Sequence, residues 1–266
     1  MFNSDELTAK LMISRGVGMT RPSQMGDFGL ADAYRVAHQL RDAEHSSGKK
    51  LAGRKIGISN PAAWDRLGLD DIVWGYLFDD TVVEAKDNTF EVSLSGLSQP
   101  RLEPEIVFGL KSELPTSTRD AADLLEHVEW LALGFEIVQN PYPNWAFTAA
   151  DLVATYGFHA NLVYGNKVLL DDSEFFAEAL AHTKVKLYKD ESLLLNGAGT
   201  NVLDSPAVAL GHLADLIATD VDATPLSAGE VITSGTLTSA ADLKAGESYR
   251  VSVTGLGLAD FTLHVT

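Results

Sequence analysis

Residues 101–110 read RLEPEIVFGL, a stretch that, after Arg101, is apolar apart from an acidic pair near its start. The apolar run 106–108 is typical of a buried strand, and side chains at positions i and i+2 of a strand lie on one face. Glu103 and Glu105 therefore point the same way. Two carboxylates this close inside a core are costly unless a cation or a shared proton offsets their repulsion. The stretch predicts a core strand that carries a chemical site.

A third carboxylate stands in a similar pattern. Residues 133–138 read LGFEIV, a strand with Glu136 and no basic neighbour. Three such carboxylates suit a hard divalent cation, Mg²⁺ or Mn²⁺, which takes oxygen ligands and keeps waters that a substrate can displace. The alternative is that Glu103 and Glu105 line the solvent face of an amphipathic strand, with Pro104 marking an edge or a bulge. On these residues alone both interpretations stay open.

Outside these two strands the chain mixes helices and short strands. Residues 30–40 have helical spacing after a capping Asp27, and Ser205 with Pro206 predicts the start of another helix. Because strands and helices do not alternate strictly, the pattern favours an α+β fold, with helices around a curled mixed sheet. We expect residues 1–60 to form a mainly helical cap and 61–266 a mixed-sheet catalytic core. Further helices are predicted from 117 or 118 to 128 and from 148 or 151 to 156, and further strands at 55–59, 131–138, 160–163, 183–188, 192–196, 230–234, 248–254 and 258–265.

Composition excludes several classes of protein. The 266 residues are 45% hydrophobic, enough for one sizeable core. A formal charge of −17 disfavours binding to nucleic acid or to an anionic membrane surface. The lack of cysteine rules out disulfides, thiolate metal sites and a cysteine nucleophile. Without a long apolar run, a secretory signal or a phosphate-cradling glycine loop, we expect a soluble, cytoplasmic protein.

Five stretches together resemble one known family. In chain order they are 53–59 (GRKIGIS), 75–80 (GYLFDD), 102–108 (LEPEIVF), 134–138 (GFEIV) and 226–236 (LSAGEVITSGT). They resemble the 2-keto-4-pentenoate hydratase and 4-oxalocrotonate decarboxylase group of the fumarylacetoacetate hydrolase superfamily, over residues 30 to 265. The resemblance implies a barrel-like roll with peripheral helices, a metal site at Glu103, Glu105 and Glu136, and a homo-oligomer, possibly complexed with a sister enzyme of the pathway.

The resemblance also implies catalytic residues. The lysine of the first stretch lies in the family's active site, which assigns Lys55; beside it, Gly57 lets a ligand approach closely. Three carboxylates and one Mg²⁺ leave a single negative charge that Lys55 would neutralise, so the pocket could accept an anionic 2-oxo acid. The alternative is an exposed lysine beside Arg54. The family's acid–base carboxylate corresponds to Asp80, or else Asp79, and the alternative there is an ordinary turn.

The chain departs from the family after Glu136. Hydratases of this group continue with an Asp-Ser-Arg-like run and later Ala-Asp-Asn, whereas residues 154–159 here read ATYGFH. Phe158 or His159 falls where a small polar residue is expected. His159 is a candidate acid–base group because its reference pKa is near neutrality, although a structural histidine is the alternative. Thr236 is a candidate donor to a substrate carboxylate, or an ordinary turn residue.

These features predict a metal-dependent lyase acting on a small 2-hydroxy-dienoate or 2-oxo-enoate. Hydration is favoured because the sequence assigns no extra cation to a second substrate carboxylate, and a 4-oxalocrotonate-type decarboxylase is the alternative. The His–Glu dyad of the superfamily's hydrolases is not evident near the N-terminus, where residues 15–18 read RGVG. Acylpyruvate hydrolase or oxaloacetate decarboxylase chemistry and an inactive partner subunit are further alternatives.

Overall fold

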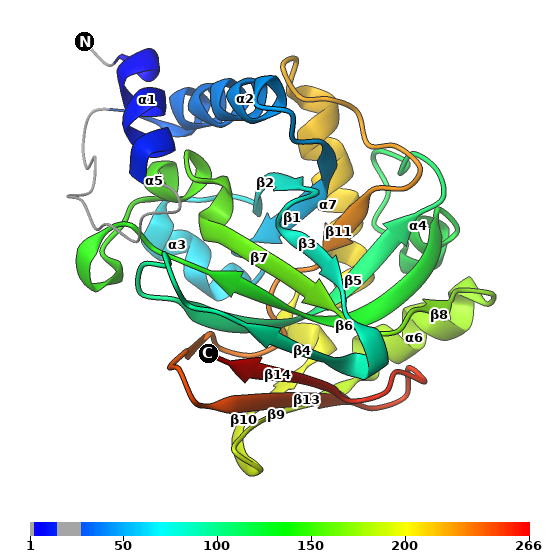
Figure 1. Cartoon of the computed structure of the whole chain (residues 1–266). Helices are drawn as coiled ribbons and strands as arrows, with labels where there is room; N and C mark the ends of the chain where they lie inside the picture. Colours follow the sequence, from blue (N-terminus) through cyan, green and yellow to red (C-terminus); the bar gives the residue numbers. More distant parts are fainter. Residues whose placement is uncertain (1–2, 15–27) are drawn as a thin grey trace.

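Two sheets and a set of outer helices make up the fold (Figure 1). The computed structural model describes residues 3–14 and 28–266, so Asp27 and the 15–18 stretch lie outside the described residues. The predicted α+β architecture with a curled mixed sheet is confirmed. The helices are α1 (Ser4–Ser14), α2 (Leu30–Ser46), α3 (Trp64–Leu67), α4 (Ala121–Leu125), α5 (Ala149–Val153), α6 (Ser173–His182) and α7 (Pro206–Thr219).

The larger sheet has nine strands and curls into a half-barrel. Its main path is β2-β1-β11-β5-β6-β7-β3, while β12 pairs with β5 and β8 pairs with β6. In that order the strands are β2 (Val73–Phe78), β1 (Leu51–Gly57), β11 (Val231–Thr233), β5 (Arg101–Leu110), β6 (Val128–Val138), β7 (His159–Tyr164), β3 (Val82–Glu84), β12 (Ala241–Asp242) and β8 (Val168–Leu169).

The smaller sheet packs beneath the curl (Figure 1). Its order is β10-β9-β13-β14-β4, with β10 (Ser192–Ala198), β9 (Lys184–Lys189), β13 (Ser248–Val253), β14 (Phe261–Val265) and β4 (Thr89–Val92). Phe135 of β6 meets Phe261 of β14 at a ring-centroid distance of 5.4 Å. The odd-numbered residues of β6 therefore face the smaller sheet, and the even-numbered ones face into the curl.

A separate apolar cluster fills part of the curl. It consists of Leu77, Val107, Ala132, Leu162, Tyr164 and Val231, with Val82 and Trp130 against it. Val107 follows Glu105 by two residues on β5, so the cluster continues along the face that carries the predicted carboxylates. On the inner face of the half-barrel, the apolar cluster and the predicted carboxylates therefore lie next to each other along β5.

Strand β1 lies inside the larger sheet. It runs parallel to β11 and antiparallel to β2, and its residues begin four positions before the predicted strand start at Lys55. Among the described residues, α1 and α2 precede it, and β1 begins at Leu51, within the predicted N-terminal segment.

Two predicted helix starts behave differently. The helix expected from Ser117 or Thr118 begins at Ala121, because Ser117 has φ 61°, outside the helical region, and Asp120 caps the helix by accepting from the backbone of the next turn. The prediction for α7 is confirmed, since Ser205 accepts from Ala207 N and Pro206 opens the helix.

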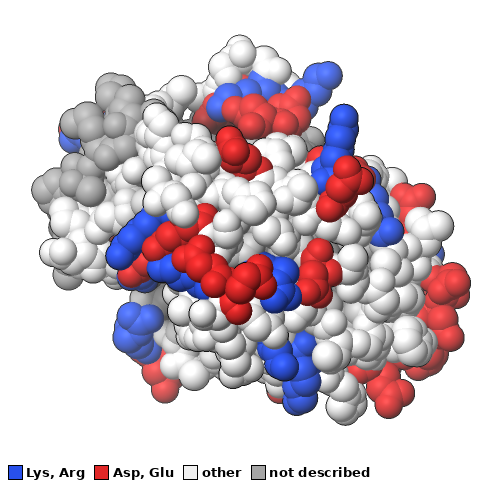
Figure 2. All heavy atoms as spheres, turned by 60° about the horizontal axis from the view of Figure 1, so that its bottom comes forward, with Lys and Arg blue, Asp and Glu red and all other residues white. Residues whose placement is uncertain are grey.

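One described helical segment, Gly199–Thr219, is long and apolar enough to span a membrane. It includes α7 and is mostly buried against neighbouring elements such as α4, so it is a core helix. On the face shown in Figure 2, acidic and basic side chains lie interspersed among broad uncharged areas. That face presents no continuous basic surface of the kind that binds nucleic acid.

Candidate active site

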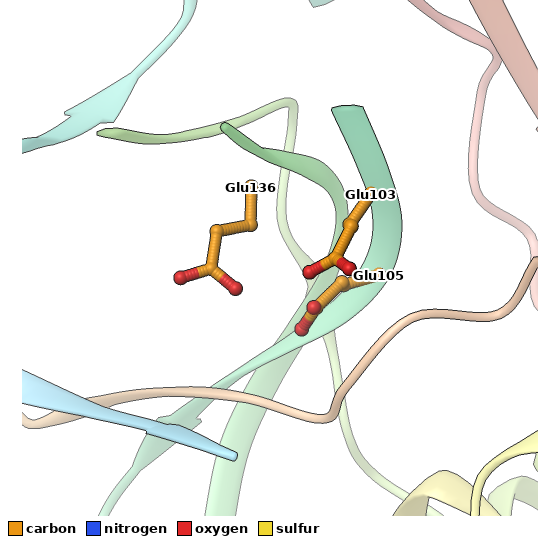
Figure 3. Close-up of side chains that lie close together, drawn as sticks. All are labelled: Glu103, Glu105 and Glu136. Atoms are coloured by element: carbon orange, nitrogen blue, oxygen red, sulfur yellow. The ribbon is translucent and has the colours of Figure 1, made fainter. Parts of the chain in front are cut away.

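Three carboxylates converge on the inner face of the half-barrel (Figure 3). Glu103 and Glu105 lie on β5, and the register pairs Glu103 directly with Glu136 of β6. One oxygen from each carboxylate lies within 4.8 Å of the others. Glu105 and Glu136 are completely buried, while Glu103 is half-buried. The solvent-face interpretation of Glu103 and Glu105 is therefore wrong.

The contacts of these carboxylates leave room for a cation. Gly235 N donates to Oε2 of Glu105 over 2.8 Å, and His159 Nδ1 lies 2.8 Å from Oε1 of Glu136. The other oxygen of Glu105, Oε1, is buried and accepts no hydrogen bond within the described part of the chain. Lys55 Nζ lies 3.0 Å from Glu136 Oε2 as an ion pair. Buried carboxylate oxygens need partners, and a hard divalent cation bound by oxygen supplies them. The residues fit such an ion.

Burial controls the protonation of the cluster. It raises the pKa of Glu103 to about 7 and that of Glu105 well above its usual range, and repulsion from neighbouring carboxylates adds to both shifts. Burial opposes ionisation of Glu136 too, but Lys55 and His159 outweigh it and hold the pKa of Glu136 below its usual value. The carboxylates likewise raise the pKa of Lys55 despite its burial. Without a metal ion the site retains protons that a bound cation would displace.

A cavity of about 520 Å³ opens onto Glu103 and Lys55. Its size is that of a small-molecule site. The three predicted substrate-contacting residues, Gly57, Phe158 and Thr236, all line it. The rings of Trp145 and Phe147 pack against Phe158 in its lining. The lining also includes residues that carry hydroxyl and amide groups, namely Ser59, Asn60, Asn201, Thr236, Thr238 and Ser239. A ligand in this cavity would meet apolar and polar walls together with the acidic cluster.

The divergent segment forms a turn that holds Lys55. Tyr156, Gly157 and Phe158 have φ values of 57°, 64° and 64°, three successive left-handed residues. Gly157 O accepts a hydrogen bond from Lys55 Nζ over 2.9 Å. The turn comes close because Gly75 of β2, opposite Lys55 in register, has no side chain; a Cβ there would lie 2.6 Å from the Tyr156 carbonyl carbon. The backbone of this turn thus holds the ammonium group of Lys55 in place.

His159 lies behind Glu136 and does not line the cavity. Both ring nitrogens are engaged: Nδ1 with Glu136 Oε1 at 2.8 Å and Nε2 with Thr81 Oγ1 at 2.9 Å. Because a carboxylate oxygen only accepts, the Nδ1–H of His159 is the donor to Glu136. The sequence suggested an acid–base group, whereas the structure places His159 where it orients Glu136.

Asp79 and Asp80 lie away from the cluster, on the exposed turn between β2 and β3. Asp79 accepts from Lys50 N over 3.0 Å, and Asp80 forms a 2.9 Å ion pair with Lys49. Neither residue lines the cavity. The structure therefore does not support an acid–base carboxylate at Asp79 or Asp80. Strand β2 ends before Asp79, and both residues lie in an exposed turn, as the alternative interpretation expected.

Sequence reasoning missed two arginines that line the cavity, Arg66 and Arg101. Arg101 precedes Glu103 by two residues on the same strand, so the period of two that links Glu103 to Glu105 also extends to Arg101. No comparable pattern marks Arg66, which reaches the cavity from the short helix α3.

A curled mixed sheet with an acidic cluster on its inner face defines a class of divalent-metal enzymes acting on small organic acids. The chain belongs to the fumarylacetoacetate hydrolase family: the model of the fumarylacetoacetate (FAA) hydrolase C-terminal domain matches residues 69–264.

Its relatives include hydratases. The chain is 31% identical over 226 residues to a 2-keto-4-pentenoate hydratase of Paraburkholderia phymatum, covering 85% of this chain and 82% of that protein. It is also 31% identical over 229 residues to a 2-hydroxyhexa-2,4-dienoate hydratase of Comamonas testosteroni, covering 85% and 83%.

The solved structure of 4-oxalocrotonate decarboxylase from Pseudomonas putida G7, complexed with magnesium and adipate, matches with a TM-score of 0.88. It is 22% identical and covers 100% of this chain and 99% of that one. At this identity the likeness shows the common fold.

Proposed function

We propose that this protein is a divalent-metal-dependent lyase that hydrates a small 2-hydroxy-dienoate by way of its 2-oxo-enoate tautomer. The observation that carries the proposal is the convergence of Glu103, Glu105 and Glu136 beside a buried lysine, at the end of a cavity of ligand size. The relatives named as hydratases support the same reaction class.

The three glutamates are the residues that would hold Mg²⁺ or Mn²⁺. Bound there, the ion would act as a Lewis acid toward the carboxylate and C2 oxygen of a 2-oxo acid. Lys55 balances the charge of the cluster, and its bond to Gly157 O keeps the ammonium group at the cavity end. The substrate carboxylate thereby meets a neutral site instead of an anionic one.

The cavity walls position the carbon chain. Phe158 and its aromatic neighbours cover the apolar dienoate chain, while Thr236 offers a hydroxyl and Gly57 a close backbone approach. Hydration proceeds by transfer of the enol proton to the terminal carbon, followed by addition of water, with its hydroxyl to C4 and its proton to C3.

The test follows the loss of dienol absorbance of 2-hydroxypenta-2,4-dienoate with Mg²⁺. We expect turnover by the wild-type protein, loss of activity with a chelator and recovery on adding metal. Glu105→Gln should abolish turnover, while Glu129→Gln, an exposed residue of β6, serves as the matched control. Absence of turnover by a folded, metal-loaded wild type would overturn the proposal.

A decarboxylase is the second candidate, because Arg66 and Arg101 supply the cations for a second carboxylate that the sequence did not assign. Measuring CO₂ release from 4-oxalocrotonate in parallel separates the two reactions. CO₂ release in place of hydration would favour the decarboxylase.

We further propose a cytoplasmic homo-oligomer, as the family resemblance implies. Light scattering coupled to size-exclusion chromatography tests the assembly, and a single 28.6 kDa species would contradict it.

A further inference from the structure

Tyr156 has a backbone conformation that is costly for a residue with a large side chain. Its φ is 57°, and Gly157 and Phe158 follow it with φ 64° each. A bulky residue in this left-handed region persists only where the surrounding structure enforces it. The side chain of Tyr156 is completely buried, so its packing supplies that enforcement. Backbone strain of this kind gathers at functional sites, and this turn lies beside Lys55.

Tyr156 packs against β2 from two sides. Its ring centroid lies 5.8 Å from that of Tyr76 and 5.9 Å from that of Phe78. Its backbone lies against Gly75, where a Cβ would come within 2.6 Å of the Tyr156 carbonyl carbon. Because successive residues of a strand point to opposite faces, the ring and the backbone of Tyr156 contact opposite sides of β2. The turn is thereby fastened to the strand that pairs with Lys55 in register.

Tyr76 is itself anchored by helix α2. Its hydroxyl group lies 2.8 Å from His38 Nδ1 and accepts a hydrogen bond from Arg41 Nη1 over 2.9 Å. The guanidinium group of Arg54 lies 4.7 Å from the Tyr76 ring centroid. Contacts at both its hydroxyl end and its face therefore fix the ring against which Tyr156 packs.

We infer that Tyr156 is a positioning residue for Lys55. The packing of its ring against the two β2 rings sets the place of the Gly157 carbonyl, which accepts a hydrogen bond from Lys55 Nζ over 2.9 Å. Without this packing the left-handed turn relaxes, and the ammonium group loses a fixed partner. The inference deepens the proposed function and rests on it, since Lys55 acts there as the cation that balances the three carboxylates.

The first experiment measures the position of Lys55 without reference to activity. The folded, metal-free protein is acetylated with acetic anhydride at low conversion, and mass spectrometry resolves the rate at each lysine. Lys55 is only 3% exposed and should react slowly in the wild type. Tyr156→Leu should raise its rate at least about tenfold, because both aromatic contacts are lost. Tyr156→Phe keeps both rings in contact and should restore slow labelling.

Tyr249→Leu is the matched control, since Tyr249 is an equally buried tyrosine of β13 in the smaller sheet. Lys186, exposed on β9, reports the reactivity of the reagent in every sample. Phe78→Leu removes one of the two ring contacts and should give a smaller increase at Lys55. This milder variant keeps the inference testable if Tyr156→Leu does not fold.

The second experiment titrates oxalate into the Mn²⁺-loaded protein by calorimetry. Tyr156→Leu should lower the affinity for oxalate about tenfold, because the ammonium group no longer faces the anion from a fixed position, and Tyr156→Phe should restore it. Labelling of Lys55 that stays at the wild-type rate in Tyr156→Leu, or that Tyr249→Leu raises equally, would overturn the inference and leave the proposed function standing. If the wild type binds no oxalate in a Mn²⁺-dependent manner, the proposed function fails, while the labelling still decides how Lys55 is held.

Discussion

Replacing Glu103 by glutamine should change how the stability of the metal-free protein depends on pH. The folded protein raises the pKa of Glu103 from 4.5 to about 7. Between these values the folded state holds a proton that the unfolded chain releases. The free energy of unfolding therefore falls as pH rises through this window, because stability decreases wherever the native state binds more protons.

The magnitude follows from the shift. One pKa unit corresponds to about 1.4 kcal/mol, so the ionised Glu103 costs the folded state about 3 kcal/mol once the pH exceeds 7. About 2 kcal/mol of this loss develops between pH 5.5 and pH 8. Glu103→Gln imitates the protonated side chain and cannot ionise, so the variant should become more stable than the wild type as the pH rises.

Urea unfolding in the presence of a chelator, at pH 5.5, 7 and 8, measures the difference. At pH 8, Mg²⁺ should make the wild type more stable than Glu103→Gln, because only the wild type offers the ion all three carboxylates. Glu129→Gln, at an exposed position near the start of β6, is the control, and its stability relative to the wild type should not change with pH. A wild-type stability that rises relative to Glu103→Gln between pH 5.5 and pH 8 without metal would refute the reasoning.

Three other predictions concern the supports of the site. His159→Ala should weaken Mn²⁺ binding about 10- to 100-fold, because Glu136 loses the donor that orients it; calorimetry measures this, and unchanged affinity would exclude a positioning role. Gly157→Ala should destabilise the fold by about 1–3 kcal/mol, since φ is +64° and a Cβ would lie 2.9 Å from Lys55 Cδ; an unchanged unfolding midpoint would contradict this. Lys55→Met should raise the pKa of Glu136, because the ion pair that lowers it is lost, and should therefore shift metal binding to higher pH. Mn²⁺ titrations at several pH values measure this shift, and a pH profile like that of the wild type would count against the ion pair.

The strand carboxylates could be predicted from the sequence because their spacing fixes their direction. In a strand, positions 103 and 105 must share a face, and the apolar surroundings mark the strand as buried. The convergence of Glu136 with that pair depends on the register between β5 and β6, which local pattern does not encode. The family resemblance supplied that step.

Contacts made by turns, or between distant parts of the chain, were harder to predict. Asp79 and Asp80 were assigned from the family resemblance, yet the turn they occupy directs them to solvent and to Lys49 and the Lys50 backbone. The contact of His159 with Glu136 joins residues 23 positions apart, and Arg66 reaches the cavity from a helix of one turn. Such contacts depend on tertiary packing, for which a single sequence carries no periodic signal.

The most direct measurement is the anomalous scattering of a crystal soaked with Mn²⁺ and oxalate. We expect a single strong peak coordinated by Glu103, Glu105 and Glu136, with oxalate completing the coordination from the cavity side. A peak that these three carboxylates do not share, or oxalate bound away from the metal, would contradict the central claim that they hold a divalent ion open to a 2-oxo acid.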